Sequence, residues 1–129
     1  MLNESDSKEA RIEVSDFLKK GYTLCTVDIA LAECLNVIWK HSNLLKDLEP
    51  KEASLAAEDL TKLYDGLSIT STRELKDEAM QIAISLNITV YDALFIAAAQ
   101  KINATLYTAD KKLFSKTSNL IKSKLLTKE

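Results

Sequence analysis

The sequence contains little glycine, proline, cysteine or histidine: two Gly, one Pro, two Cys and one His in 129 residues. So few turn-forming residues argue against an all-β sandwich or barrel, in which short strands follow one another through tight turns. Cys25 and Cys34 have no second pair, and His41 stands alone, so the ligand spacing of a zinc site is absent. We therefore expect two free, buried cysteines in a reducing compartment.

An excess of positive charge and long apolar runs are also missing. Lys plus Arg is 17 and Asp plus Glu is 19, so the formal net charge is −2. Any contact with a polyanion must therefore be local or run through bound cations. The longest nearly apolar run, residues 93–99, is far shorter than the roughly 18 residues that span a bilayer. The polar N-terminus (MLNESDSKEA) lacks the apolar core of a signal peptide, so we expect a cytoplasmic protein with no membrane partner.

Apolar residues make up 47% of the chain and charged residues 28%, which is typical of a globular protein. The length predicts one domain over residues 1–129. Apolar periodicity and capping residues predict helices at 5–20, 28–42, 51–64, 72–86 and 89–102, a helical turn at 111–114, and strands at 22–27, 67–70, 105–108 and 121–126. Short strands separated by helices indicate a parallel sheet with helices on both faces. The functional site of such a sheet lies beyond the carboxyl ends of its strands.

Three acidic residues fall in this region of the predicted fold. Glu33 lies in the helix after the first strand, Asp92 in the first turn of the apolar helix, and Asp110 directly after the strand at 105–108. Converging carboxylates repel one another, and the pKa of each rises. Mg²⁺ or Mn²⁺ would remove that repulsion, because hard divalent cations prefer carboxylate oxygen and retained water. The joint placement therefore predicts a divalent-metal site.

Each acid also has a simpler interpretation. Asp92 and Asp110 are placed to cap helices, as is Asp28 at the start of the helix at 28–42. Glu33 is also explained as a helix acid whose carboxylate reaches water. On this interpretation the chain is a generic α/β domain whose three candidate carboxyl groups lie far apart.

Other catalytic chemistry has little support, because the glycines are isolated and one His makes no triad. Four lysines follow Asp92 along the chain and lie near Asp110 in the sequence. They form either a solvated face or a rim that contacts phosphate: Lys101, Lys111, Lys112 and Lys116. Lys111 and Lys112, directly after Asp110, are the candidate phosphate contacts.

The three acids lie in segments of recognisable sequence: residues 29–39 (IALAECLNVIW), 89–97 (TVYDALFIA) and 106–113 (LYTADKKL). In series, these segments resemble the PIN-domain family, and most closely the VapC-type toxins of bacteria and archaea. The likeness follows the family's order and spacing over nearly the whole chain. It implies a PIN-like three-layer α/β/α fold with a short, mostly parallel sheet.

The resemblance further implies a metal-dependent endoribonuclease, the toxin of a toxin–antitoxin pair. Glu33, Asp92 and Asp110 match the second, third and fourth acids of the family's metal-binding set. Asn36 and Thr108 match flanking positions that support those ligands. Bound Mg²⁺ or Mn²⁺ would orient and acidify a water for attack on an RNA phosphodiester. The expected partners are RNA, a small antitoxin protein and a second copy of the chain in a homodimer.

The sequence departs from the family at its start. PIN chains open with a strand that carries the first metal-binding Asp and forms the middle of the sheet, and these residues do not include it. Glu4 and Asp6 are no substitutes, because they belong to the first predicted helix. Three explanations are open: the natural protein carries the strand upstream, a partner or a rearranged sheet fills the gap, or the chain is a degraded relative. With one carboxylate fewer, we expect weak or no cleavage. The alternative function is a catalytically impaired PIN-like domain that acts as a self-association or protein-binding module.

Overall fold

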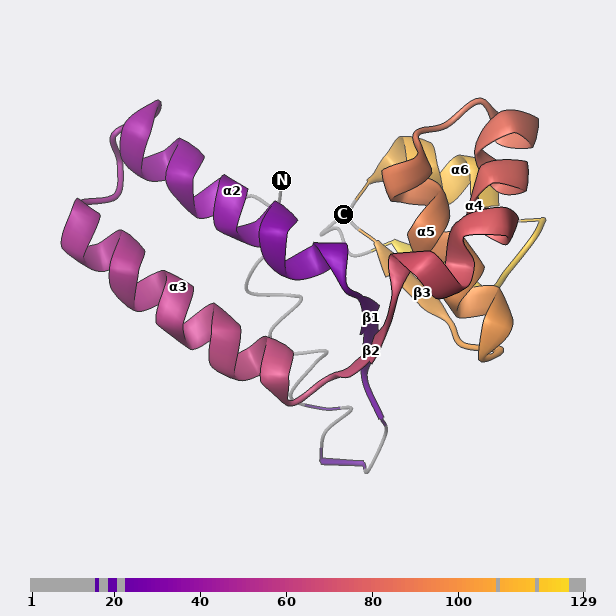
Figure 1. Ribbon diagram of the computed structural model, residues 1–129, viewed down its shortest axis with the longest axis horizontal. Helices are drawn as coiled ribbons and strands as arrows, with labels where there is room; N and C mark the ends of the chain where they lie inside the picture. The colour runs from indigo at the N-terminus through magenta and orange to yellow at the C-terminus, as the bar shows by residue number, and fades with distance from the viewer. Residues whose placement is uncertain (1–15, 17–18, 21–22, 109, 118, 126–129) are drawn as a thin grey trace.

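Helices alternate with three-residue strands along the chain (Figure 1). The computed structural model describes residues 16, 19–20, 23–108, 110–117 and 119–125. Its strands are β1 (Cys25–Val27), β2 (Ser68–Thr70), β3 (Leu106–Thr108) and β4 (Ser123–Leu125). Its helices are α2 (Ile29–Asn43), α3 (Pro50–Asp65), α4 (Thr72–Leu86), α5 (Val90–Lys101) and α6 (Lys111–Thr117). The predicted helix at 5–20 lies mostly outside the described residues.

Local capping explains where the two central helices begin. The Ser71 hydroxyl accepts a hydrogen bond from the amide of Glu74 at 3.1 Å and starts α4. The Thr89 hydroxyl does the same for the amide of Asp92 at 3.2 Å and starts α5. Between them, Asn87 ends α4 in the left-handed conformation with φ 53°. The chain therefore reverses within three residues, and α4 packs along α5.

The strands form two parallel pairs. In one pair, β1 lies beside β2, with Thr26 opposite Ile69; in the other, β3 lies beside β4, with Tyr107 opposite Lys124. No described strand joins the pairs. Helix α5 contacts both β1 and β3 and so bridges the two pairs. The parallel strands between helices confirm the predicted α/β fold.

The core lies where α4 and α5 meet β1. Leu75, Leu94 and Val27 are almost completely buried in it. Small residues on the facing sides of the helices, Ala79 on α4 and Ala93 on α5 among them, are completely buried and allow the helices to approach closely. Six of the twelve residues of α5 are buried, which confirms its predicted central position.

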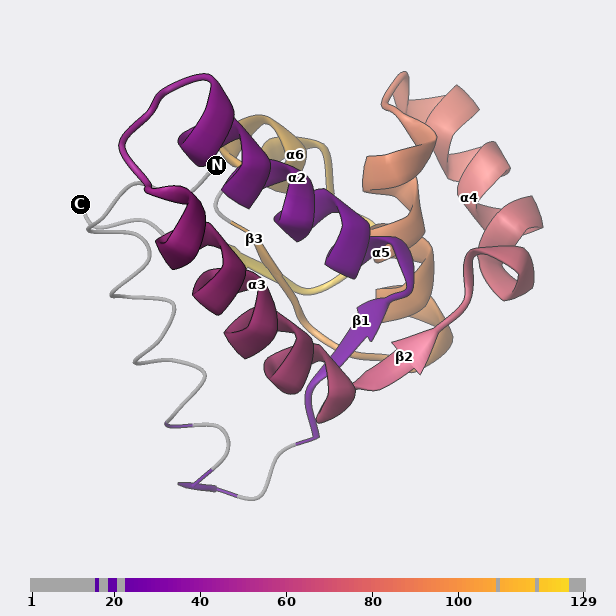
Figure 2. The ribbon, with the colours of Figure 1, turned by 60° about the vertical axis from the view of Figure 1, so that its left-hand side comes forward.

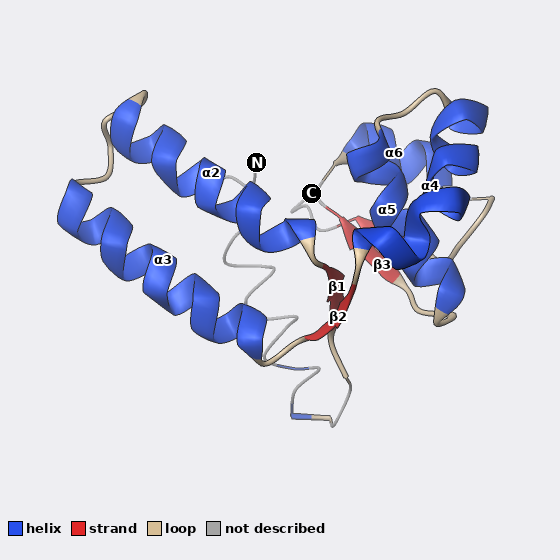
Figure 3. Cartoon of the chain, in the orientation of Figure 1, coloured by secondary structure: helices blue, strands red, loops and turns tan. Residues whose placement is uncertain are grey.

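Helices α2 and α3 form a hairpin that buries no residue, and the hairpin projects away from α4 (Figure 2). Figure 3 shows β1 and β2 between this hairpin and the remaining helices. The prediction of buried cysteines is wrong: Cys25 and Cys34 are free but exposed. Cys34 lies on α2, none of whose residues is fully buried, and Cys25 lies at the outer end of β1, where only Val27 is buried.

The C-terminal part differs in length from the prediction. The helical turn expected at 111–114 continues to Thr117, whose buried hydroxyl donates to the carbonyl of Phe114 at 3.1 Å. The strand expected at 121–126 is shorter and spans Ser123–Leu125. Within the described residues, no single helix is long and apolar enough to cross a membrane. Helices α4 and α5 reach the necessary length and apolar composition only when taken together, and the chain bends by 118° between them.

Candidate active site

Three different elements carry the predicted acids. Glu33 lies in the second turn of α2, directly after β1, and Asp92 lies in the first turn of α5. Asp110 stands between β3 and α6. Because α5 contacts both β1 and β3, it brings Asp92 into the region between the other two acids.

Asp110 caps α6, as the simpler interpretation predicts. Its Oδ1 accepts hydrogen bonds from the amides of Lys112 at 2.9 Å and Leu113 at 3.0 Å. Its own amide donates to the Thr108 hydroxyl at 3.1 Å, so the end of β3 also fixes its backbone. These bonds orient the carboxylate. Its second oxygen accepts no hydrogen bond from the described residues and remains available to a ligand.

Asp92 is the half-buried member of the three. Burial and the negative charge of Asp110 raise the pKa of its carboxyl group. A hydrogen bond with the Thr89 side chain and the positive charge of Lys116 lower that pKa, but the upward effects are larger. The Thr89 hydrogen bond and the Lys116 charge therefore do not fully offset the effects of burial and of Asp110 on the pKa of Asp92.

Glu33 extends the same acidic cluster, although the residue itself is exposed. Partial burial of its carboxyl group and the charge of Asp92 raise its pKa. Burial raises the pKa of the Cys34 thiol, and the negative charge of Glu33 is a second, smaller cause of the same shift. The raised pKa favours the unreactive protonated thiol. The charge of Asp92 thus contributes to the raised pKa of Glu33, and the charge of Asp110 contributes to the raised pKa of Asp92.

The donor set suits a hard divalent cation, because all three side chains offer carboxylate oxygens. The described residues nevertheless contain no group of three or more His, Cys, Asp or Glu side chains already arranged to hold one ion. The described acids thus influence one another's pKa values without forming a preformed ion site.

Comparison with known proteins identifies the family. Residues 2–120 match the model of the PIN domain. The chain belongs to the PIN-domain family. It is 34% identical over 120 residues to the Ribonuclease VapC3 of Pyrobaculum aerophilum, which covers 92% of this chain and 86% of the relative.

Two further similarities agree with this assignment. The Exonuclease VapC9 of the same organism is 25% identical over 105 residues, covering 81% of this chain and 75% of the relative. The crystal structure of PAE2754 from Pyrobaculum aerophilum superposes with a TM-score of 0.69 at 23% identity, covering 93% of this chain and 85% of that chain. The structural match shows that the PIN-like fold was predicted correctly.

The two predicted supporting residues of this PIN domain differ in what they contact. The Thr108 hydroxyl accepts a hydrogen bond from the amide of Asp110, as described above, and so helps to fix the backbone of that acid. Asn36 lies one turn after Glu33 on α2, where it is exposed. Thr108 therefore contacts one of the predicted site acids directly, whereas Asn36 only lies on the same face of α2 as Glu33.

The four lysines near the site have different environments. Lys111 and Lys112 are exposed at the start of α6, beside Asp110. Lys101 pairs with Glu74 on α4 at 2.9 Å. Lys116 is half-buried and donates to backbone carbonyl oxygens at the end of α4. Lys111 and Lys112, which are exposed beside Asp110, stay the predicted phosphate contacts. The sequence pattern alone grouped all four.

Asp28 departs from its prediction as a helix cap. It precedes α2, but its side chain makes no capping hydrogen bond to that helix. Instead, its carboxylate accepts one hydrogen bond from the backbone amide of Thr72 at 2.9 Å and another from the Thr72 hydroxyl at 2.5 Å. Burial raises its pKa, and these hydrogen bonds outweigh burial and lower it overall. Asp28 is therefore already engaged with the start of α4.

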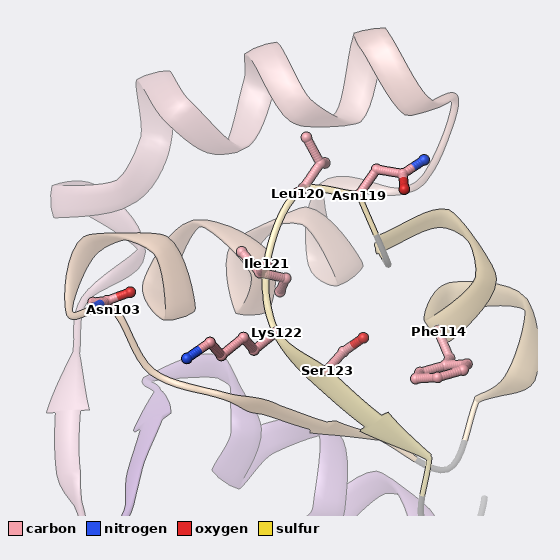
Figure 4. A pocket seen from close by; sticks show the side chains of 7 residues that line it. All are labelled: Asn103, Phe114, Asn119, Leu120, Ile121, Lys122 and Ser123. Atoms are coloured by element: carbon pink, nitrogen blue, oxygen red, sulfur yellow. The ribbon is translucent and has the colours of Figure 1, made fainter.

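An open hollow of about 580 Å³ lies elsewhere on this PIN domain (Figure 4). It lies between Asn103, two residues after α5, Phe114 on α6 and the segment 119–123 that leads into β4. None of the three acids lines it, so it is distinct from the acidic cluster.

Proposed function

We propose that this PIN-domain protein is a metal-dependent endoribonuclease and the toxin of a toxin–antitoxin pair. The observation that carries the proposal is the electrostatic coupling of Glu33 and Asp110 to Asp92, which raises the pKa of Glu33 and Asp92. Acidic groups whose pKa is raised by burial and by a neighbouring negative charge are often found at functional sites, which supports the proposal. The curated relatives are named a ribonuclease and an exonuclease, which supports nuclease chemistry.

The three acids would hold Mg²⁺ or Mn²⁺ through carboxylate oxygens. When bound, such an ion acidifies a water and neutralises charge on the phosphate of the substrate. The capping bonds on one oxygen of Asp110 leave the other oxygen directed by a rigid turn. Thr89 holds the backbone of Asp92 in the same way. Lys111 and Lys112 would contact phosphates on either side of the scissile bond and orient the RNA strand.

The partners follow from the same chemistry. An RNA strand meets the acidic cluster through the bound ion and the two exposed lysines. The small antitoxin would cover the acidic groove and exclude RNA. A second copy of the chain would complete a homodimer. The relatives' names support the toxin assignment, since both are VapC proteins.

The direct test measures metal binding and cleavage separately. Calorimetric titration with Mn²⁺ should give saturable uptake by the wild-type chain, and Asp92→Asn or Glu33→Gln should weaken it by at least about tenfold. Asp59→Asn, which removes an exposed carboxylate from α3, is the matched control and should bind as the wild type does. No saturable uptake by the wild type would overturn the metal site.

Cleavage is tested on a circular single-stranded RNA with Mg²⁺ or Mn²⁺. An endonuclease linearises the circle, whereas an exonuclease leaves it intact. The wild type is expected to cleave weakly, and the two acid variants should abolish that residual activity together, because each removes a ligand of the same ion. Wild-type activity that persists in both would show that other residues perform the reaction.

The second candidate function is a binding module without catalysis. The separation of the strands into two unjoined pairs and the open arrangement of the acids favour it. This candidate predicts that the wild type takes up no Mn²⁺ and cleaves no RNA but still associates with itself or with an antitoxin. Sedimentation analysis alongside the two assays distinguishes the candidates.

A further inference from the structure

Lys116 connects two parts of the chain that carry site acids. Its side chain leaves α6, the helix that Asp110 caps. Its Nζ donates to the carbonyl oxygens of Leu86 and Asn87, each at 3.3 Å. Those residues end α4, and two residues later Thr89 caps the helix that carries Asp92.

The geometry at the end of α4 explains why a lysine binds there. The last carbonyl groups of a helix lack partners within the helix, and they carry the negative end of its dipole. Asn87 turns the chain in the left-handed conformation, which leaves these carbonyls accessible. An ammonium group satisfies both the hydrogen-bonding and the electrostatic requirement. Lys116 is half-buried, so its side chain has less freedom than that of an exposed lysine.

Asp110 and Asp92 are both attached to the parts of the chain that Lys116 connects, which are α6 and the corner between α4 and α5. Asp110 is bound to α6 through two amides of that helix, so any shift of α6 carries its carboxylate along. Asp92 is bound to the start of α5 through Thr89. We propose that Lys116 is a positioning residue, which fixes α6 against the corner between α4 and α5 and so sets the separation of Asp110 from Asp92. The positive charge of Lys116 also lowers the pKa of Asp92, which agrees with an ammonium group near that acid.

Hydrogen exchange tests the structural step without any metal. Lys116→Met keeps most of the aliphatic stem and removes the donors, and Lys116→Arg keeps both charge and donors. Exchange at the amides of α6 and residues 86–89 should become about two- to fivefold faster in Lys116→Met. It should stay near the wild-type rate in Lys116→Arg. The control, Lys76→Met, removes an exposed lysine of α4 that pairs with Asp77. Unchanged exchange in Lys116→Met would overturn the proposal.

Mn²⁺ titration tests the functional step, which rests on the proposed metal site. Lys116→Met makes the cluster more negative, so a purely electrostatic role predicts tighter Mn²⁺ binding. A positioning role predicts binding weaker by about tenfold, restored in Lys116→Arg. Faster exchange with unchanged or tighter Mn²⁺ binding would overturn positioning and leave Lys116 a structural contact. If the wild type itself binds no Mn²⁺, the proposed function fails, and the exchange result still decides whether Lys116 fixes α6.

Discussion

The side chain of Asp28 joins the end of β1 to the first residue of α4, 44 positions later in the sequence. The link lies beside the core residue Val27, so it fixes the entrance of α4 against the strand. The sequence predicted that Asp28 caps α2, because an Asp directly before a helix usually accepts hydrogen bonds from the first amides of that helix. The longer-range bond forms because the Thr72 amide and hydroxyl together offer two donors.

Asp28→Asn should destabilise the protein by about 1–3 kcal/mol, because it loses a charged acceptor of two hydrogen bonds. Folding lowers the pKa of Asp28 below its ordinary value of 3.8. Its stabilisation is therefore present above that value and is lost as pH falls through the lower, folded-state pKa. Urea unfolding at pH 7 and at pH 2–3 should show a difference between wild type and variant that shrinks in acid.

A double-mutant cycle with Thr72→Val tests the partner. The two substitutions should be less than additive, since each removes the same hydrogen bond. Full additivity would show that the two side chains act independently, in contradiction to the observed contact.

Asp92→Asn should stabilise the metal-free protein at neutral pH, with a Tm higher by about 1–3 °C after allowance for solvent screening. Folding raises the pKa of Asp92, so the native state holds this proton more tightly than the unfolded state does. The penalty from its charge therefore grows as pH rises above the unfolded value and is absent in acid. The favourable position of an acid in the first helical turn opposes this effect.

Thermal unfolding across pH 3–7 checks the sign. The Tm difference should disappear near pH 3, and the control Asp59→Asn should show little at any pH. A variant less stable than wild type at pH 7 would show that Asp92 acts chiefly as a helix residue rather than as a strained site residue.

At the scale of elements, local signals predicted most helices well. Pro50 and Gly66 bracket α3, and Ser71 and Asn87 bracket α4, because capping depends on neighbouring residues. The attachment of Lys116 was not predictable in this way, since its partners lie about 30 positions earlier in the sequence. For the same reason, the sequence could place three acids on the correct elements but could not show how open their arrangement is.

The close approach of α4 and α5 depends on small residues, which makes it sensitive to volume. Ala79→Leu places a larger side chain at a completely buried position of this interface and should cost about 1–3 kcal/mol of stability. Met80→Leu, at the adjacent half-exposed position, should change stability by less than about 0.5 kcal/mol. Denaturant unfolding of both variants provides the comparison. Equal effects would mean that the helices do not pack as closely as the structure shows.

At the scale of the whole molecule, the net charge of −2 limits how the protein can hold RNA. The acidic cluster repels phosphate, and Lys111 and Lys112 are exposed positive groups beside Asp110. Binding should therefore depend on a few local contacts rather than on a general positive field. This situation differs from that of basic nucleic-acid-binding domains, whose affinity falls steeply with salt.

The affinity for a non-cleavable single-stranded RNA analogue, measured at a fixed Mn²⁺ concentration, should fall with monovalent salt at a log–log slope of about −1.4, since two phosphate contacts each contribute about −0.7. Lys111→Met should reduce the slope by about half, and the double variant with Lys112→Met should bring it near zero. Lys76→Met, which removes the same charge from the surface of α4, should leave the slope unchanged. A steep slope in the double variant would place the RNA on a different surface, because the two lysines would then contribute little to holding the strand.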